Sequence, residues 1–133
     1  MSEGKKIALP VVGNDKVTVE QPRTRAEGGD IMSEIANEVS QNAIVLYMKG
    51  TPDQPMCGFS ARAASILNSY GVPYYSVNIL ADQDKRQAIK EYSDWPTIPQ
   101  VYIGGEFLGG SDILTQMYEN GQLDQVIGGL NKG

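Results

Sequence analysis

An unbroken apolar run, Ala43–Met48, is the feature that most restricts how this chain can fold. A strand with one solvated face alternates apolar and polar residues, whereas an uninterrupted run is typical of a strand buried on both faces. Just before the run, Ile31, Ile35 and Val39 recur at helical spacing, and Asp30 stands where a helix cap belongs. The sequence therefore predicts a buried strand preceded by a short amphipathic helix.

Predicted helices and strands alternate along the rest of the chain. Gly71 ends the helix that follows Cys57, and Gly104-Gly105 turns the chain into a hairpin. The order αβαβαββαα contains a β-α-β unit, which requires a parallel pair, and the hairpin adds an antiparallel pair. We therefore predict an α/β fold with a four-stranded mixed sheet flanked by helices. The strands are expected at about 43–48, 74–79, 100–103 and 106–108, and the helices at about 31–39, 57–70, 82–92, 113–118 and 123–130.

Residues 1–30 differ from the rest. They mix short apolar pieces with glycine and proline, show no sustained period, and carry five acidic and five basic residues. This pattern predicts a disordered N-terminal extension, followed by one folded domain over 31–133. The extension lacks the apolar core of a signal peptide, and its acidic residues are atypical of an organellar transit peptide.

Composition excludes several classes of function. The formal net charge of −5 argues against nucleic-acid binding, which needs a dense basic face, and no apolar run approaches the roughly 18–20 residues of a membrane helix. The chain has one cysteine and no histidine, so an internal disulfide, a His-assisted nucleophile and most catalytic zinc sites are excluded. A reduced thiol fits an intracellular reducing compartment: the cytoplasm if the source is bacterial, or the mitochondrial matrix or the stroma.

Cys57 is the candidate reactive group. It lies between a loop that follows a buried strand and the start of a helix, where free amides and the helix dipole favour a thiolate. Lys49, at the end of the strand, could add positive charge from across the loop. The alternative is that Cys57 is a small buried hydrophobic residue, as most lone cysteines are.

Four ordered blocks carry a resemblance to a known family. They are Lys49-Gly-Thr-Pro, Cys57-Gly-Phe59-Ser60, Trp95-Pro-Thr-Ile-Pro-Gln100 and Gly109-Gly-Ser-Asp112. Together they resemble the monothiol glutaredoxins of the CGFS class, over about residues 31–130. The resemblance implies a thioredoxin-like fold and makes Cys57, with Phe59 beside it, part of a site for glutathione and metal.

The resemblance also implies which other residues bind glutathione. Lys49 would meet a glutathione carboxylate or lie beside the sulfur, while Arg86 and Lys90, four residues apart on one helical face, would hold the glycine carboxylate. In the loop Thr97-Ile98-Pro99, which has a cis proline in the family, the backbone of Ile98 would pair with the cysteine of glutathione. Gly110-Ser111-Asp112 would hold the γ-glutamyl end through free amides and the Asp112 carboxylate.

Taken without the motifs, these residues have simpler explanations. Arg86 and Lys90 could belong to a solvated helix face, Asp112 could be a helix N-cap, and Pro99 could open a strand. The chain also departs from many relatives, which carry a second cysteine where it has Ser111. An intramolecular disulfide with Cys57 is therefore impossible, and redox regulation by that route is excluded.

The single thiol separates the possible functions. Ser60 occupies the position of the second cysteine of dithiol glutaredoxins and cannot resolve a mixed disulfide. A [2Fe–2S] cluster needs four ligands, which two chains and two glutathiones would supply. The resemblance therefore implies a homodimer that is bridged by the cluster and is monomeric without it. It also implies that the protein delivers clusters to apo iron–sulfur proteins or pairs with a BolA-type partner. The alternatives are a glutathione-dependent monothiol disulfide oxidoreductase, whose enzyme activity the sequence leaves uncertain, and a catalytically silent interaction module.

Overall fold

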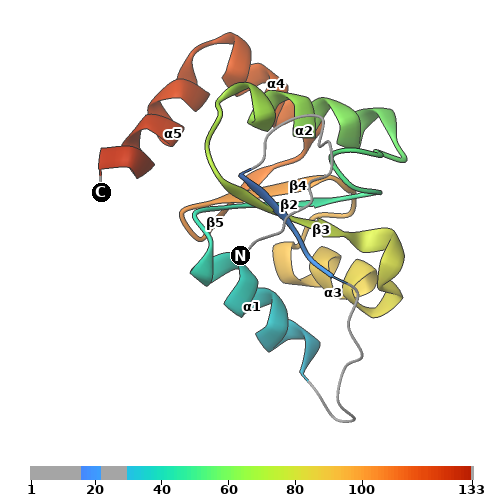
Figure 1. Ribbon diagram of the computed structural model, residues 1–133. Helices are drawn as coiled ribbons and strands as arrows, with labels where there is room; N and C mark the ends of the chain where they lie inside the picture. The colour runs from blue at the N-terminus through green and yellow to red at the C-terminus, as the bar shows by residue number, and fades with distance from the viewer. Residues whose placement is uncertain (1–15, 22–29, 133) are drawn as a thin grey trace, which may run out of the picture.

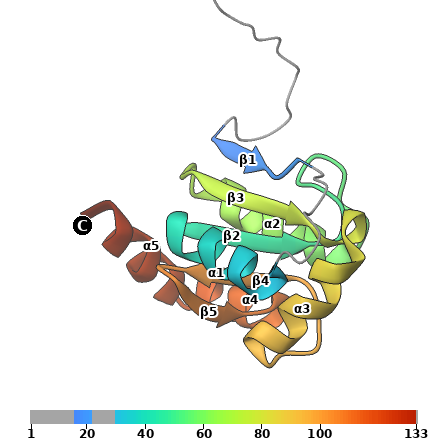
Figure 2. The same ribbon diagram turned by 90° about the horizontal axis from the view of Figure 1, so that it is seen from below.

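The computed structural model describes residues 16–21 and 30–132, which form one sheet with helices on both faces (Figure 1). The strand order is β1-β3-β2-β4-β5. Helices α1 and α3 cover one face of the sheet, and α2, α4 and α5 pack on the other (Figure 2). The elements are β1 (Val17–Val19), α1 (Ile31–Gln41), β2 (Ile44–Met48), α2 (Gly58–Ser69), β3 (Tyr74–Asn78), a 3-10 turn (Ile79–Ala81), α3 (Gln83–Ser93), β4 (Gln100–Ile103), β5 (Glu106–Gly109), α4 (Ser111–Glu119) and α5 (Gln122–Lys132).

Strand β2 is buried on both faces, as its apolar run predicts. Ile44, Leu46 and Met48 pack into the core under α2 and α4, whereas Val45 and Tyr47 pack into the core under α1 and α3. β2 pairs in parallel with β3 and antiparallel with β4, and β4 pairs antiparallel with β5. The β-α-β unit and the terminal hairpin of the predicted mixed sheet are thereby confirmed.

Side chains and glycines set the helix ends where the sequence places them. The Asp30 carboxylate accepts a hydrogen bond from the Met32 amide at 3.0 Å, and the Asp82 carboxylate accepts one from the Lys85 amide at 3.0 Å. Gly71 follows α2 with a φ of 65°, a left-handed conformation that glycine adopts without a Cβ penalty. Among the described residues no helix combines the length and apolar character that crossing a membrane requires.

The sheet has five strands, one more than the four predicted. β1, from the predicted disordered extension, pairs in parallel with β3, placing Val17 opposite Tyr74 and Val19 opposite Ser76. Three residues are too few to show a period, and the strand owes its formation to the backbone edge of β3, which it covers. The prediction of disorder is therefore wrong for 17–19, while residues 1–15 and 22–29 lie outside the described part of the chain.

Candidate functional site

A pocket of about 440 Å³ opens beside Cys57. All of the residues that the sequence analysis assigned to the site line it: Lys49, Cys57, Phe59, Arg86, Lys90, Thr97, Ile98, Pro99, Gly110, Ser111 and Asp112. Trp95, Pro96 and Ile113 complete the lining. The pocket gathers residues from across the fold because the loops after β2 and before β4 and the starts of α2 and α4 meet at one end of the sheet, next to α3.

The loop from residue 49 to 56 is closed on itself and tied to β3. The Met56 amide donates to the Lys49 carbonyl at 2.9 Å, and the Gly50 amide donates to the Asn78 side chain at 2.9 Å. Gly50 has a φ of 89°, and a Cβ there would stand 2.7 Å from the Met56 nitrogen. Only glycine suits this position. The hydrogen bonds of the loop hold Lys49 and Cys57 at fixed positions relative to each other.

Cys57 is the N-cap residue of α2, and it is half-buried at the wall of the pocket. The Ser60 amide is the main influence that holds the pKa of the Cys57 thiol below its ordinary value. The Phe59 amide, the Ser60 hydroxyl and the Lys49 ammonium act in the same direction, and partial desolvation opposes them. The thiol makes no capping hydrogen bond of ordinary geometry, so the effect is electrostatic, from amide dipoles at a helix start.

Ser60 holds the β2 end against α2. It is 0% exposed, and its hydroxyl accepts a hydrogen bond from the Lys49 amide at 3.0 Å. The residue that replaces a resolving cysteine is thus a buried structural group that also favours the Cys57 thiolate. Sequence reasoning identified what Ser60 cannot do, but not this tie between strand and helix.

Two basic side chains form the α3 wall of the pocket. Arg86 and Lys90 lie one helical turn apart, and both are half-buried. With Lys49 they bring three cationic groups to the pocket, against the single carboxylate of Asp112. A chain with an overall charge of −5 therefore presents a locally positive pocket, which favours an anionic ligand.

The loop before β4 is anchored by Gln100, a residue that sequence reasoning missed. Gln100 is fully buried, and its side-chain amide donates to the Trp95 and Thr97 carbonyls at 3.1 and 3.2 Å. The Ile98-Pro99 peptide bond is cis, as the resemblance implies. The signal that could have identified Gln100 is its place as the last residue of the Trp95–Gln100 block.

The start of α4 forms the wall opposite the loop. Gly110 is the N-cap residue, so the alternative that Asp112 caps the helix is wrong; Asp112 lies exposed in the first turn. A Cβ on Gly110 would lie 3.2 Å from the Pro99 carbonyl oxygen, so a larger residue would require the Pro99 backbone to shift. The Ser111 hydroxyl is buried, lines the pocket and has no hydrogen-bond partner among the described residues.

Known proteins resemble both the sequence and the fold. The glutaredoxin family model matches residues 44–108. A monothiol glutaredoxin of Synechocystis sp., uncharacterized, is 52% identical over 89 residues, which are 67% of this chain and 83% of that protein. The mitochondrial monothiol glutaredoxin-S15 of Arabidopsis thaliana is 50% identical over 93 residues, 70% of this chain and 55% of that protein.

A solved structure agrees with these sequence relatives. The solution structure of a monomeric truncated mutant of Trypanosoma brucei 1-C-Grx1 superposes with a TM-score of 0.71 at 38% identity, over 78% of this chain and 94% of that one. The thioredoxin-like fold that the resemblance implies is thereby confirmed. By sequence and by structure, the chain belongs to the glutaredoxin family, among the monothiol glutaredoxins.

Proposed function

We propose that this chain binds a [2Fe–2S] cluster with glutathione and transfers it to apo iron–sulfur proteins. The observation that carries the proposal is the position of Cys57, a lone thiol biased toward the thiolate at the edge of a positively charged pocket. In this proposal the cluster is the substrate: the protein binds it, keeps it and releases it to a recipient.

The pocket suits glutathione by charge. Reduced glutathione has two carboxylates and one ammonium group, and the pocket offers three cations and one carboxylate. Arg86 and Lys90 would take one carboxylate of glutathione, and Asp112 would pair with its ammonium group. The buried Ser111 hydroxyl would find in the ligand the partner that it lacks among the described residues. Ile98 would offer its backbone to the cysteine of glutathione.

The ligand count supports a dimer. A [2Fe–2S] cluster is held by four thiolate-type ligands, and each chain has one cysteine. Two copies of Cys57 and two glutathione thiolates complete the set, so the cluster would bridge two chains that separate when it leaves. Met56 and Phe59, next to Cys57, are 67% and 62% exposed, an apolar surface that such a contact would cover. A BolA-type partner could replace one chain.

A glutathione-dependent monothiol reductase is the second candidate. The lowered pKa of Cys57 favours it because the thiolate is also the nucleophile in disulfide exchange. The buried Ser60 counts against it, since each turnover would need a second glutathione from solution to release the mixed disulfide. The relatives include mitochondrial and bacterial proteins, and both compartments would supply reduced glutathione and iron–sulfur recipients.

Anaerobic reconstitution tests the proposal. The purified chain is incubated with iron, sulfide and a thiol reductant, with and without glutathione, while visible absorption and solution mass are recorded. We expect a glutathione-dependent chromophore on a dimer, absent from Cys57→Ser and retained by Ser65→Ala, an exposed serine of the same helix. A colourless monomer that reduces glutathionylated substrates would establish the reductase instead.

A further inference from the structure

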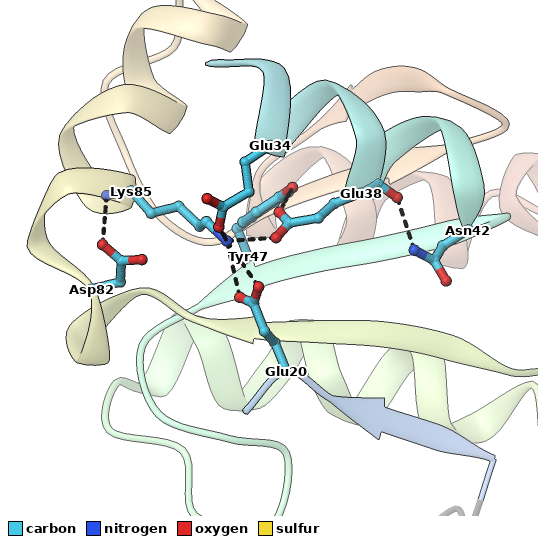
Figure 3. A network of polar contacts seen from close by, with 7 residues as sticks. All are labelled: Glu20, Glu34, Glu38, Asn42, Tyr47, Asp82 and Lys85. Carbon is cyan, nitrogen blue, oxygen red and sulfur yellow. Dashed lines mark hydrogen bonds and ion pairs between the residues drawn. The ribbon is translucent and has the colours of Figure 1, made fainter. Parts of the chain in front are cut away.

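Lys85 is a buried lysine on the sheet face opposite α2. Its ion pairs connect α3 with α1 and with the residue that follows β1. The Lys85 ammonium on α3 is 0% exposed and contacts Glu20 at 2.9 Å, Glu34 at 2.7 Å and Glu38 at 2.5 Å (Figure 3). Glu20 directly follows β1, and Glu34 and Glu38 project from α1. We call these four residues the Lys85 cluster. It connects the end of β1 to α1 and α3 through side chains.

Its three carboxylates crowd one another around a single ammonium group. Carboxylate oxygens of Glu20, Glu34 and Glu38 all lie within 4.8 Å of one another, and the three side chains are largely buried. Glu38 accepts hydrogen bonds from the Tyr47 hydroxyl at 2.7 Å and from Lys85. Three buried carboxylates this close to a single ammonium group cannot all ionise without cost, and Glu38, the most buried of the three, is the one that favours a retained proton.

We propose that the Lys85 cluster is a proton-dependent latch: while Glu38 is protonated, the other two carboxylates pair with Lys85 and β1 is held on the sheet, and when that proton leaves, β1 is loosened from the β3 edge. Loosening would expose the backbone of Tyr74–Ser76, an unpaired strand edge able to accept another strand. The proposal concerns the N-terminal segment and stands independently of what the pocket binds.

The direction of the pH dependence follows from burial. Desolvation, with Glu20 adding to it, raises the pKa of Glu38 to about 7, while Lys85 and the Tyr47 hydroxyl oppose the rise. When β1 leaves, the contribution of Glu20 is lost and the pKa of Glu38 falls. The docked state therefore binds the proton more tightly, and docking weakens as pH rises through about 7.

Glu20, directly after β1, and Glu34, on α1, face Glu38, and both pair with Lys85. The neighbouring tyrosines and Lys85 do not change charge in this range. Burial raises the pKa of Tyr47 on β2 and that of Tyr102 on β4, so both stay neutral. Lys85 has a raised pKa because its three carboxylate partners outweigh its desolvation, and it stays charged. Asp82 accepts from the Lys85 amide at the start of α3, and Tyr75 on β3 packs beside this core.

Amide hydrogen exchange of the full chain tests the latch. The Glu20 amide donates to the Ser76 carbonyl at 2.8 Å only while β1 is docked. Loss of one proton from Glu38 predicts that the protection factor of the Glu20 amide falls about tenfold between pH 6 and pH 8. The Gly104 amide, which donates to Ala43 at the far end of β2, is expected to keep its protection over the same range.

Variants and a direct titration decide the outcome. Glu38→Gln removes the titrating carboxylate, and we expect it to keep β1 docked with no pH dependence from 6 to 8; Glu119→Gln, on exposed α4 surface, should behave as the parent chain. If Glu38→Gln does not fold, the side-chain carboxyl carbon of Glu38 is followed by NMR in the parent chain, where a midpoint near 7 supports the latch. A midpoint near 4.5, or protection of the Glu20 amide that is unchanged with pH, would overturn it.

Discussion

Replacing Ser60 by alanine tests the tie between β2 and α2 most directly. The buried hydroxyl accepts from the Lys49 amide at 3.0 Å, and alanine leaves that amide without its partner in a partly buried position. An unsatisfied donor of this kind costs about 1–2 kcal/mol. With a urea slope of roughly 1.5 kcal/mol per M for a small domain, the unfolding midpoint should fall by roughly 1 M.

The same variant should change the thiol. The Ser60 hydroxyl helps hold the pKa of Cys57 down, but the Ser60 amide, which is the larger influence, remains in the alanine variant. The pKa of Cys57 should therefore rise yet stay below its ordinary value, which thiolate absorbance at 240 nm would follow as a function of pH. Ser65→Ala, on the exposed side of α2, is the matched control. Equal urea midpoints for the two variants would refute the structural role that we assign to Ser60.

Three further predictions concern the pocket and the Lys85 cluster. Gly110→Ala should weaken glutathione binding in calorimetry, because its Cβ would lie 3.2 Å from the Pro99 carbonyl oxygen and would push the Thr97–Pro99 loop out of place, whereas Gly128→Ala, in open space on α5, should bind normally. Arg86→Ala should weaken glutathione binding by about tenfold, the loss of one charge-assisted contact, and the exposed Arg62→Ala should not; equal affinities would remove Arg86 from the site. In Glu38 the native state keeps a proton that the unfolded chain loses near pH 4.5, so the free energy of unfolding should fall as pH rises from about 4.5 through about 7, and this slope should flatten in Glu38→Gln.

The order of elements and the composition of the pocket could be predicted because each depends on local patterns or on motif blocks. The apolar run that forms β2 predicts a strand buried on both faces whatever its position in the sheet. The N-cap at Asp82 depends only on residues of the helix that it begins. The residues lining the pocket come from short blocks at the ends of elements, which the topology brings to one end of the sheet.

The features that sequence reasoning missed depend on distant partners. β1 is three residues long and becomes a strand only because β3 offers an open edge 57 positions later, at Tyr74. Lys85 looks like any surface lysine of an amphipathic helix, since nothing near it in sequence shows that Glu20 and α1 will cover it. Gln100 likewise acquires its role only when the loop before it folds back onto its side chain.

The long separation between β1 and β3 has a consequence for how the chain folds during synthesis. A ribosome releases the N-terminal segment first, yet β1 finds no strand to pair with until Tyr74–Ser76 has been made. The contacts of β4 with β5 span only a hairpin, whereas those of β1 with β3 close a loop of 57 residues. Closing the longer loop costs more conformational entropy, so we expect the β1 contacts to form later. β1, the earliest described strand of the sheet along the chain, is therefore expected to join the sheet after the β2–α2–β3 unit has formed, as an addition to a framework that already exists.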